Sequence, residues 1–167
     1  ISSTVGWAVG DAGTILKTTN GGTNWLVQSS GTSNGLNSLH FIDVNTGWVV
    51  GGTFLTSIIL KTTNGGTNWI TQSSGTSKWL QSVYFSDVNT GWAVSYLTIL
   101  KTTNGGTNWM EQTSGTNNDL FSVHFTDINT GWAVGGSGTI IKTTNGGTNW
   151  FMQSSGTSYW LWSVQFT

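Results

Sequence analysis

A nine-residue sequence, Lys-Thr-Thr-Asn-Gly-Gly-Thr-Asn-Trp, occurs four times in this chain without a substitution. Successive copies are separated by 44, 40 and 41 residues, and they begin at Lys17, Lys61, Lys101 and Lys142. The same period is followed by a second set of tryptophans: Trp7, Trp48, Trp92 and Trp132. A fixed period of this length is typical of folds in which one supersecondary unit is copied and stacked. The repeat therefore constrains the fold more than any other feature of the sequence.

Each unit contains four short runs of β-branched and aromatic residues, bounded by Gly, Asn, Asp, Ser and Thr, and this pattern predicts strands joined by turns. In the second unit the expected strands are 36–42 (A), 47–51 (B), 57–63 (C) and 69–73 (D). The Asn-Gly between strands C and D is a strong hairpin signal because both residues tolerate positive φ. No run has a helical pattern. Four antiparallel strands in every unit predict an all-β protein built from β-propeller blades.

The expected domain organisation is a single β-propeller, residues 1–167, with four four-stranded blades. Blade 2 is expected at 36–74, blade 3 at 80–114 and blade 4 at 120–155. Blade 1 is expected to combine residues 1–30 with an innermost strand A from 161–167, because Phe166 aligns with Phe41. Pairing of that strand with residues 6–10 would hide an edge that otherwise invites aggregation. One chain could close as a four-bladed ring, two chains could exchange ends to give eight blades, or an open series of exchanges could build a fibre.

The repeated element resembles a known hairpin. Thr18-Thr-Asn-Gly-Gly-Thr-Asn-Trp25 is similar to the Asp-box, or BNR, motif S-x-D-x-G-x-T-W, with Thr for Ser, Asn for Asp, and its own Thr one position early. With the Gly-Trp-Ala-Val-Gly strand before it, the unit resembles the Ycf48-like repeats of photosystem assembly factors and of many secreted bacterial proteins. The resemblance covers the whole chain. It implies that the hydroxyl and the Asn side chain bond to turn amides while the Trp wedges into the blade.

The residue chemistry agrees with this structural role. Asn forms Asx-turns, paired glycines permit the required backbone, and a Trp buries about 150 to 250 Å². The residues expected to act in this way are Asn20, Trp25, Asn64, Trp69, Asn104, Trp109, Asn145 and Trp150.

The charge composition excludes several partner classes. Only 7% of the residues are charged, the net charge is -1, and the five cationic residues are all lysines. A nucleic acid or an anionic membrane normally needs a basic surface that displaces counterions, so neither partner is expected. No apolar run approaches the roughly 20 residues of a membrane span. The absence of Cys excludes disulfides and thiolate metal sites, and no cofactor is expected.

An enzyme must be considered because Asp-boxes also occur in sialidases. Those enzymes need an arginine cluster that grips the substrate carboxylate, and this sequence contains no arginine. One repeated turn position, where capping of turn amides is expected, holds Asp43, Asp87 and Asp127. The other acidic residues form no repeated or locally clustered pair of the kind that paired-carboxylate catalysis requires; they are Asp11, Glu111 and Asp119. The sequence therefore favours a non-catalytic protein.

Two further sets of repeated positions allow a ligand-binding interpretation. His40 and His124 are equivalent in strand A, and a metal or anion on the propeller axis is conceivable. The equivalent Tyr84 and Gln165 are poor metal ligands, however, so polar packing on inner strands is expected and no metal site. The repeated lysines could form a ligand ring, but we expect each to lay its stem over a neighbouring Trp.

The units differ mainly at two connections. The count from the strand B Trp to the strand C Lys is 10, 13, 9 and 10, whereas the count from each Asp-box Trp to the next strand B Trp is always 23. Composition varies in the D–A connection. In an up-and-down blade, the B–C and D–A connections lie on one face, opposite the A–B turn and the Asp-box hairpin. The varied face carries the candidate ligand-binding residues Phe54, Lys78, Trp79, Tyr96, Asp119, Tyr159 and Trp160.

Aromatic and polar residues on loops over a rigid scaffold form a typical recognition surface. Such rings can stack on sugars, and they can equally bury against a protein, including a second copy of this chain. Alternatively, several of them fill the centre of the propeller, since Phe121 and Trp162 lie on inner strands.

We expect a non-catalytic binding or scaffold module, extracellular or on a bacterial cell surface, that recognises a glycan or a protein. The alternatives are a self-assembling structural protein and, by resemblance alone, a chaperone like the assembly factors. The resemblance implies an arginine-rich patch for the plant and cyanobacterial factors, which this chain lacks.

Overall fold

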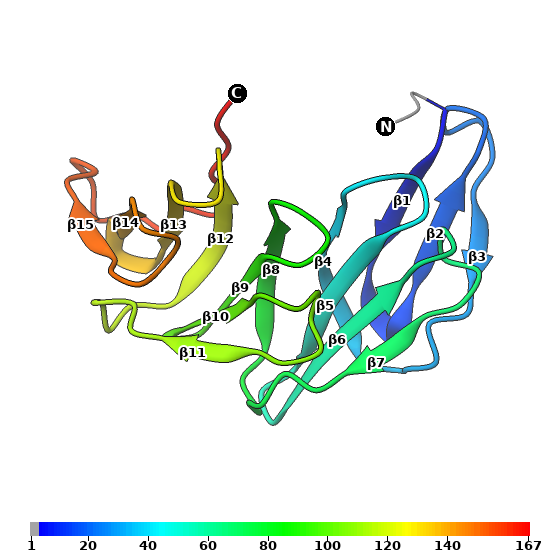
Figure 1. Ribbon diagram of the computed structural model, residues 1–167, viewed down its shortest axis with the longest axis horizontal. Helices are drawn as coiled ribbons and strands as arrows, with labels where there is room; N and C mark the ends of the chain where they lie inside the picture. The colour runs from blue at the N-terminus through cyan, green and yellow to red at the C-terminus, as the bar shows by residue number, and fades with distance from the viewer. Residues whose placement is uncertain (1–3) are drawn as a thin grey trace.

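A computed structural model of the chain describes residues 4–167. The backbone forms four antiparallel sheets that follow one another as blades (Figure 1). The first sheet contains β1 (Gly6–Val9), β2 (Ile15–Thr18) and β3 (Leu26–Gln28). The second contains β4 (Gly35–Phe41), β5 (Gly47–Thr53), β6 (Thr56–Thr62) and β7 (Ile70–Gln72). The third contains β8 (Leu80–Phe85), β9 (Gly91–Ser95), β10 (Thr98–Thr102) and β11 (Met110–Gln112). The fourth contains β12 (Leu120–Phe125), β13 (Gly131–Gly135), β14 (Ile140–Thr143) and β15 (Phe151–Gln153).

Strand order in every sheet follows the chain, so the strands of a blade are joined by successive hairpin connections. The predicted strands of the second unit agree with β4 to β7 within two residues at each end. The all-β propeller architecture predicted from the repeat is confirmed. Two 3-10 turns were not predicted: η1 (Asp11–Gly13) and η2 (Gly136–Gly138), in the B–C connections of blades 1 and 4.

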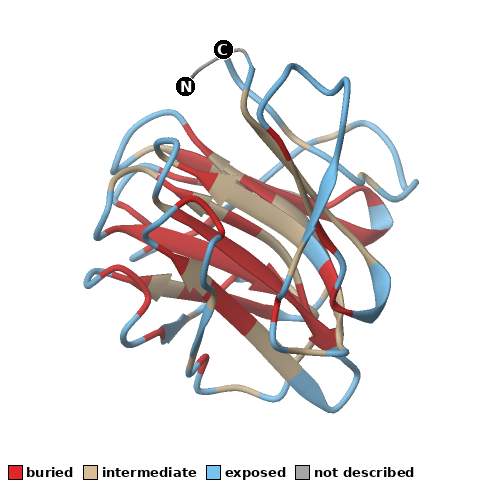
Figure 2. Cartoon of the chain, turned by 90° about the vertical axis from the view of Figure 1, so that its right-hand side faces the viewer, coloured by how far each residue is buried: buried red, intermediate tan, exposed pale blue. Residues whose placement is uncertain are grey.

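The apolar core lies between neighbouring blades. Trp48 of β5 is fully buried, and its ring stacks on Phe85 of β8 with centroids 3.5 Å apart and planes at 8°. The same contact joins Trp7 to Phe41 and Trp92 to Phe125. Figure 2 shows buried residues along the strands and exposed residues on many of the connections. Each pair of neighbouring blades is therefore joined by the same stacked Trp–Phe contact.

The first blade differs from the prediction. Among residues 4–167, β1 pairs only with β2, and residues 161–167 form no strand. The expected pairing of that segment with residues 6–10 of the same chain is not made, so the chain does not close as the predicted four-bladed ring. The reason is that the segment packs on blade 4, where Phe166 stacks on Trp132 at 3.8 Å. The first sheet and this segment lie at opposite ends of an open arc (Figure 1).

Candidate functional site

The Asp-box hairpins join strands C and D of each blade. In blade 2, Thr62 Oγ1 accepts hydrogen bonds from the amides of Asn64 (3.3 Å) and Gly66 (2.9 Å). Asn64 Oδ1 accepts from the Asn68 amide at 2.9 Å. The turn needs glycine because Gly65 and Gly66 have φ of 66° and 87°. The predicted bonds from hydroxyl and Asn to the turn amides are confirmed.

The Asp-box tryptophans of blades 3 and 4 wedge into their own blades, as predicted. Trp109 and Trp150 are 8% and 6% exposed, and each meets an inner-strand Phe edge-on at 5.8 Å. Trp25 is 43% exposed. Blade 1 has no inner strand within the described chain, so no Phe covers Trp25.

Two of the repeated lysines, Lys17 and Lys61, connect their blade to the next hairpin. Lys61 Nζ lies 5.1 Å from the Trp48 ring centroid, which confirms the predicted placement of the Lys over a Trp. The ammonium also donates to the Gly105 carbonyl at 2.9 Å, and Trp48 Nε1 donates to the same oxygen at 3.1 Å. These bonds between blades were not predicted, because they depend on how adjacent blades meet. Burial lowers the pKa of Lys61, in keeping with a packed structural position.

The aspartates of the A–B turns cap backbone amides as predicted. Asp43 Oδ1 accepts from the amides of Asn45 (2.6 Å) and Thr46 (2.8 Å), and these bonds lower the pKa of the carboxyl. Asp87 and Asp127 make the equivalent bonds at 2.7 and 2.9 Å. Three of the six acidic residues are thus committed to turn structure.

The histidines lie in a column of rings across three inner strands. Tyr84 lies between them, with centroids 4.6 Å from His40 and 4.9 Å from His124. Burial, and then the charge of His124, lower the pKa of His40 from 6.5 to about 4. Within residues 4–167, no three His, Cys, Asp or Glu side chains are placed to hold a metal ion. The column is therefore described by packed, mutually tilted rings, with interplanar angles of 54° and 56°.

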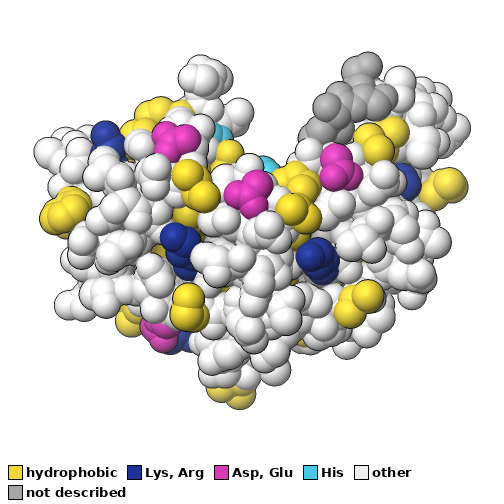
Figure 3. All heavy atoms as spheres, in the orientation of Figure 1, with side chains coloured by type: hydrophobic (Ala, Val, Ile, Leu, Met, Phe, Trp, Pro, Cys, Tyr) yellow, Lys and Arg dark blue, Asp and Glu magenta, His cyan; other side chains and the backbone are white. Residues whose placement is uncertain are grey.

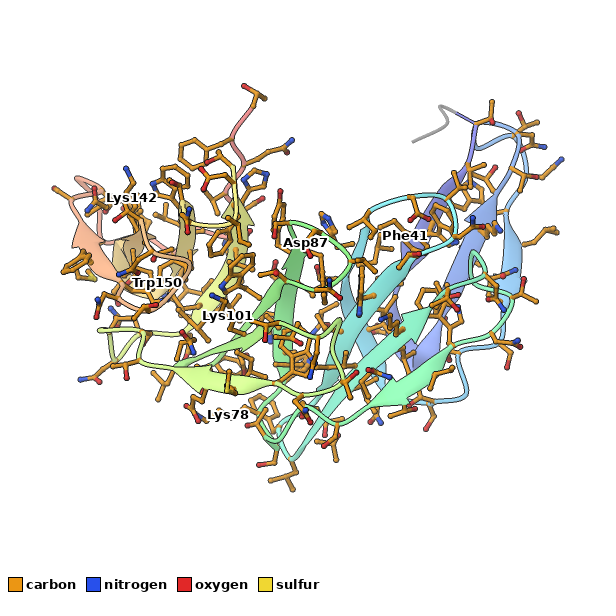
Figure 4. All side chains as sticks on the ribbon, in the orientation of Figure 1. Phe41, Lys78, Asp87, Lys101, Lys142 and Trp150 are labelled. Atoms are coloured by element: carbon orange, nitrogen blue, oxygen red, sulfur yellow. The ribbon has the colours of Figure 1, made fainter. Side chains whose placement is uncertain are left out.

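The varied connections share one face, as predicted. Connections of the two kinds are bonded to each other, since the Gly136 amide donates to the Asp119 carbonyl (2.9 Å) and Ser95 Oγ donates to the Trp79 carbonyl (2.6 Å). In Figure 4, Lys78 lies near one end of β8 and Asp87 near the other. We call the side that carries the B–C and D–A connections the loop face, and the side that carries the A–B turns and Asp-boxes the hairpin face.

Three predicted site residues on the loop face meet in one cluster. Phe54 lies 5.4 Å from Trp79 and 6.1 Å from Tyr96, and the latter two rings are 6.3 Å apart between centroids. Phe54 is 76% exposed, whereas Trp79 and Tyr96 are half-buried. Phe54 comes from blade 2 and the other two rings from the start of blade 3 and its B–C turn. We call this set the loop-face cluster.

The other predicted site residues lie elsewhere. Trp160 packs with Phe121 and Trp162 at the end of the arc, at centroid distances of 5.5 and 5.4 Å. Trp160 belongs to the last part of the described chain, where no further blade covers it. Its exposure alone therefore does not indicate a binding site. Asp119 contributes its main-chain carbonyl, and Tyr159 is exposed without a ring contact among the described residues.

Lys78, another predicted member of the recognition surface, forms an ion pair on the loop face. Its ammonium pairs with Glu111 at 3.3 Å and bonds to the Thr98 hydroxyl. Both charged side chains are largely exposed, so the ion pair contributes no more than about 1 kcal/mol. Lys78 therefore links the D–A connection to the outer strand of blade 3.

A polar hollow of about 370 Å³ lies on the loop face beside this ion pair. It is lined by Leu97, Glu111, Gln112, Thr113, Ser114, Gly115, Thr116 and Asn117. No pattern in the sequence indicated this hollow, because its shape comes from the course of the backbone in the D–A connection. The loop face thus presents an aromatic cluster and, next to it in the chain, a polar depression.

The surface charges are sparse. In the view of Figure 3, lysine and acidic side chains are scattered over the surface without a continuous basic patch. No helix in the described part of the chain is both long and apolar enough to cross a membrane.

Repeated Asp-box blades with a ring contact at each junction define a BNR-type β-propeller protein. The family model described as photosynthesis system II assembly factor YCF48 matches residues 1–76 and 69–154. The chain belongs to this family, which confirms the resemblance inferred from the repeat. A search of curated proteins found no match.

Solved structures show the same fold. A structure titled "YCF48 bound to D1 peptide" is 20% identical, with a TM-score of 0.56, and the match covers 92% of this chain and 64% of that one. YCF48 from Cyanidioschyzon merolae is 18% identical, with a TM-score of 0.70 and coverage of 95% and 56%. An ancestral GH74 enzyme is 22% identical, with a TM-score of 0.70 and coverage of 89% and 22%. The chain therefore spans less than two thirds of either YCF48 structure, and these identities establish the fold alone.

Proposed function

We propose that this chain is a non-catalytic protein-binding module, and that its loop face receives a segment of a partner protein. The observation that carries the proposal is the loop-face cluster, in which exposed Phe54 of blade 2 meets Trp79 and Tyr96 of blade 3. Aromatic residues are enriched in the cores of protein interfaces, and Trp and Tyr often dominate their binding energy. The structure of YCF48 with a D1 peptide supports a protein as the partner class.

The acidic residues support the absence of catalysis. Asp43, Asp87 and Asp127 accept bonds from turn amides, and Glu111 pairs with Lys78. The sequence has no arginine that could grip an anionic substrate. The similarity to the ancestral GH74 enzyme covers 22% of that chain, and it supports a shared fold without supporting a shared activity.

A glycan is the second candidate partner. The polar hollow beside Leu97 is favourable for it, because the hydroxyl, amide and carboxylate groups that line the hollow can form hydrogen bonds with the hydroxyls of a sugar. A glycan partner would agree with the extracellular or cell-surface location expected from the sequence, which stays a prediction.

The test compares two exposed phenylalanines. Wild type, Phe54→Ala and Phe151→Ala are applied to an array of short peptides that includes D1 sequences, and to a glycan array. Phe151 is the matched control, since it is exposed on outer strand β15, away from the loop-face cluster. We expect peptide binding by wild type and Phe151→Ala, and at least about a tenfold loss in Phe54→Ala, as for an interface hot spot.

The outcomes separate the candidates. Binding to glycans alone would replace the protein partner by a carbohydrate. Binding that Phe54→Ala leaves intact would show that the loop-face cluster is not the site, and no binding to either array would contradict the proposal.

A further inference from the structure

We infer that the partner segment carries a basic side chain close to its apolar one, and that this basic side chain enters the polar hollow beside Glu111. The inference rests on the proposed function, because it names the chemistry of the segment that the loop face receives. The apolar side chain of the segment contacts the loop-face cluster, and its basic neighbour reaches the hollow.

The loop-face cluster and the hollow are connected through the backbone at two places. Tyr96 of the cluster and Leu97 of the hollow together form the turn between β9 and β10. Trp79 of the cluster follows Lys78, whose ammonium pairs with Glu111 in the wall of the hollow. Consecutive Cα atoms lie about 3.8 Å apart, so one short segment of a partner can contact both places.

The charged side chains are divided unequally between the two faces. The hairpin face carries more lysines than aspartates: Lys17, Lys61, Lys101 and Lys142 against Asp43, Asp87 and Asp127. The loop face carries three carboxylates and one ammonium: Asp11, Glu111 and Asp119 against Lys78. Negative charge is therefore in excess on the loop face, and a partner with positive charge is complementary to it.

The carboxylate of Glu111 can accept a further donor. Its Oε1 accepts from Thr98 Oγ1 at 3.1 Å and lies 3.3 Å from Lys78 Nζ. Within residues 4–167 its Oε2 accepts no hydrogen bond, and the Glu111 side chain is 59% exposed. An arginine guanidinium presents a planar fork of N–H donors that matches a carboxylate, so it suits this oxygen.

The walls of the hollow offer acceptors for the other donors of a guanidinium. Thr113 and Asn117 are exposed there, and their side chains make no hydrogen bond within residues 4–167. A guanidinium donates and does not accept, so hydroxyl and amide oxygens are suitable partners for it. The volume of about 370 Å³ lies in the range of ligand sites, about 300 to 1,000 Å³, so one long side chain has room.

The backbone is strained where the cluster and the hollow meet. Leu97 has φ of 59°, a left-handed conformation that a bulky side chain rarely adopts. Glycine would take this place in the turn between Ser95 and Thr98 without strain. The leucine instead gives the hollow an apolar wall, and strain of this kind concentrates at ligand sites.

Blade 3 is alone in carrying a charged group at the position of Glu111. The other blades have Val27, Thr71 and Met152 there. The repeated fold therefore provides this acidic hollow once, and we expect a single basic residue in the partner segment rather than a repeated basic pattern.

Peptide binding tests the preference for positive charge. The probe is a library of short peptides with an arginine within about three positions of a phenylalanine, and a second library with citrulline, the neutral isostere, in its place. We expect wild type to bind the arginine peptides about five- to tenfold more tightly, because a charge-assisted hydrogen bond is stronger than a neutral one. This preference should decrease as the salt concentration rises.

Two variants break the same ion pair with opposite expected effects. Glu111→Gln keeps the shape of the side chain and removes its charge, so the preference for arginine should disappear. Lys78→Gln removes the competing ammonium, so arginine peptides should bind more tightly. Asp11→Asn is the matched control, because it removes one negative charge from the loop face at a residue that does not line the hollow, and it should keep the preference.

The proposed function and this inference can fail separately. Equal binding of arginine and citrulline peptides by wild type, with binding lost in Phe54→Ala, would overturn the inference and leave the proposed function intact. A preference that persists in Glu111→Gln, or that Asp11→Asn also removes, would place the recognition of charge outside the hollow and overturn the inference. Weaker binding in both Glu111→Gln and Lys78→Gln would assign the effect to loss of their ion pair, and no binding by wild type would contradict both proposals.

Discussion

At the scale of single residues, His40 couples stability to pH. Burial lowers its pKa from 6.5 to about 4, so the folded chain binds this proton more weakly than the unfolded chain does. The stabilisation is complete above pH 6.5 and is lost as the pH falls toward 4, because the unfolded state then takes up the proton first. The folded state, in which His40 is packed against Tyr84, is thus more stable when the imidazole of His40 is neutral.

We predict that the unfolding free energy of wild type decreases between pH 6.5 and about 4. His40→Gln should flatten much of this slope, because glutamine does not titrate and already occupies the equivalent position 165. Urea unfolding at several pH values measures the effect. An unchanged slope in His40→Gln would assign the pH dependence to other groups, such as the turn aspartates.

At the scale of the elements, the Asp-box is a local device that closes strands C and D. Asn104 Oδ1 accepts from the Asn108 amide at 2.9 Å and from Thr102 Oγ1 at 3.0 Å. The Asn108 side chain makes no hydrogen bond within residues 4–167, although it belongs to the same hairpin. Comparing Asn104 with Asn108 therefore distinguishes an asparagine side chain that holds the turn from one that faces solvent.

We predict that Asn104→Ala lowers the unfolding free energy by about 1 kcal/mol and that Asn108→Ala changes it by less than about 0.5 kcal/mol. Denaturant unfolding of the two variants measures the difference. Equal effects would show that the side-chain bonds of the Asp-box contribute little to the blade.

Local features of these elements were predictable from the sequence. The strand bounds, the Asp-box bonds and the Asp43 cap each depend on residues a few positions apart, and the repeat shows their pattern four times. The contacts between blades were not predicted, because Phe85 and Trp48 belong to different units and the sequence does not show how units stack.

At the scale of the whole molecule, the arrangement of the blades decides which of the predicted binding residues lie together. Only Phe54, Trp79 and Tyr96 of the predicted residues meet in one cluster, and Lys78 turns to Glu111 instead. The prediction that one chain closes on itself as a four-bladed ring was wrong for the same reason. Alignment with Phe41 correctly indicated that Phe166 packs against the preceding blade, but residues 161–167 form no strand, and only the curvature of the arc shows that the first blade lies out of their reach.

We expect the hairpin face to contribute mainly to stability and the loop face to contribute mainly to binding. The hairpin face carries the buried Trp109 and Trp150, while the loop face carries half-buried Trp79. Removing a buried Trp costs about 3 to 5 kcal/mol, which corresponds to roughly 10 °C in melting temperature for a chain of this size.

The most direct test is thermal unfolding of Trp79→Ala and Trp109→Ala, with peptide-array binding measured on the same samples below the melting transition. We predict that Trp109→Ala melts about 10 °C below wild type yet binds normally, whereas Trp79→Ala melts near wild type and does not bind. The reverse pattern, with Trp79→Ala unstable or Trp109→Ala stable and unable to bind, would contradict the division between the two faces.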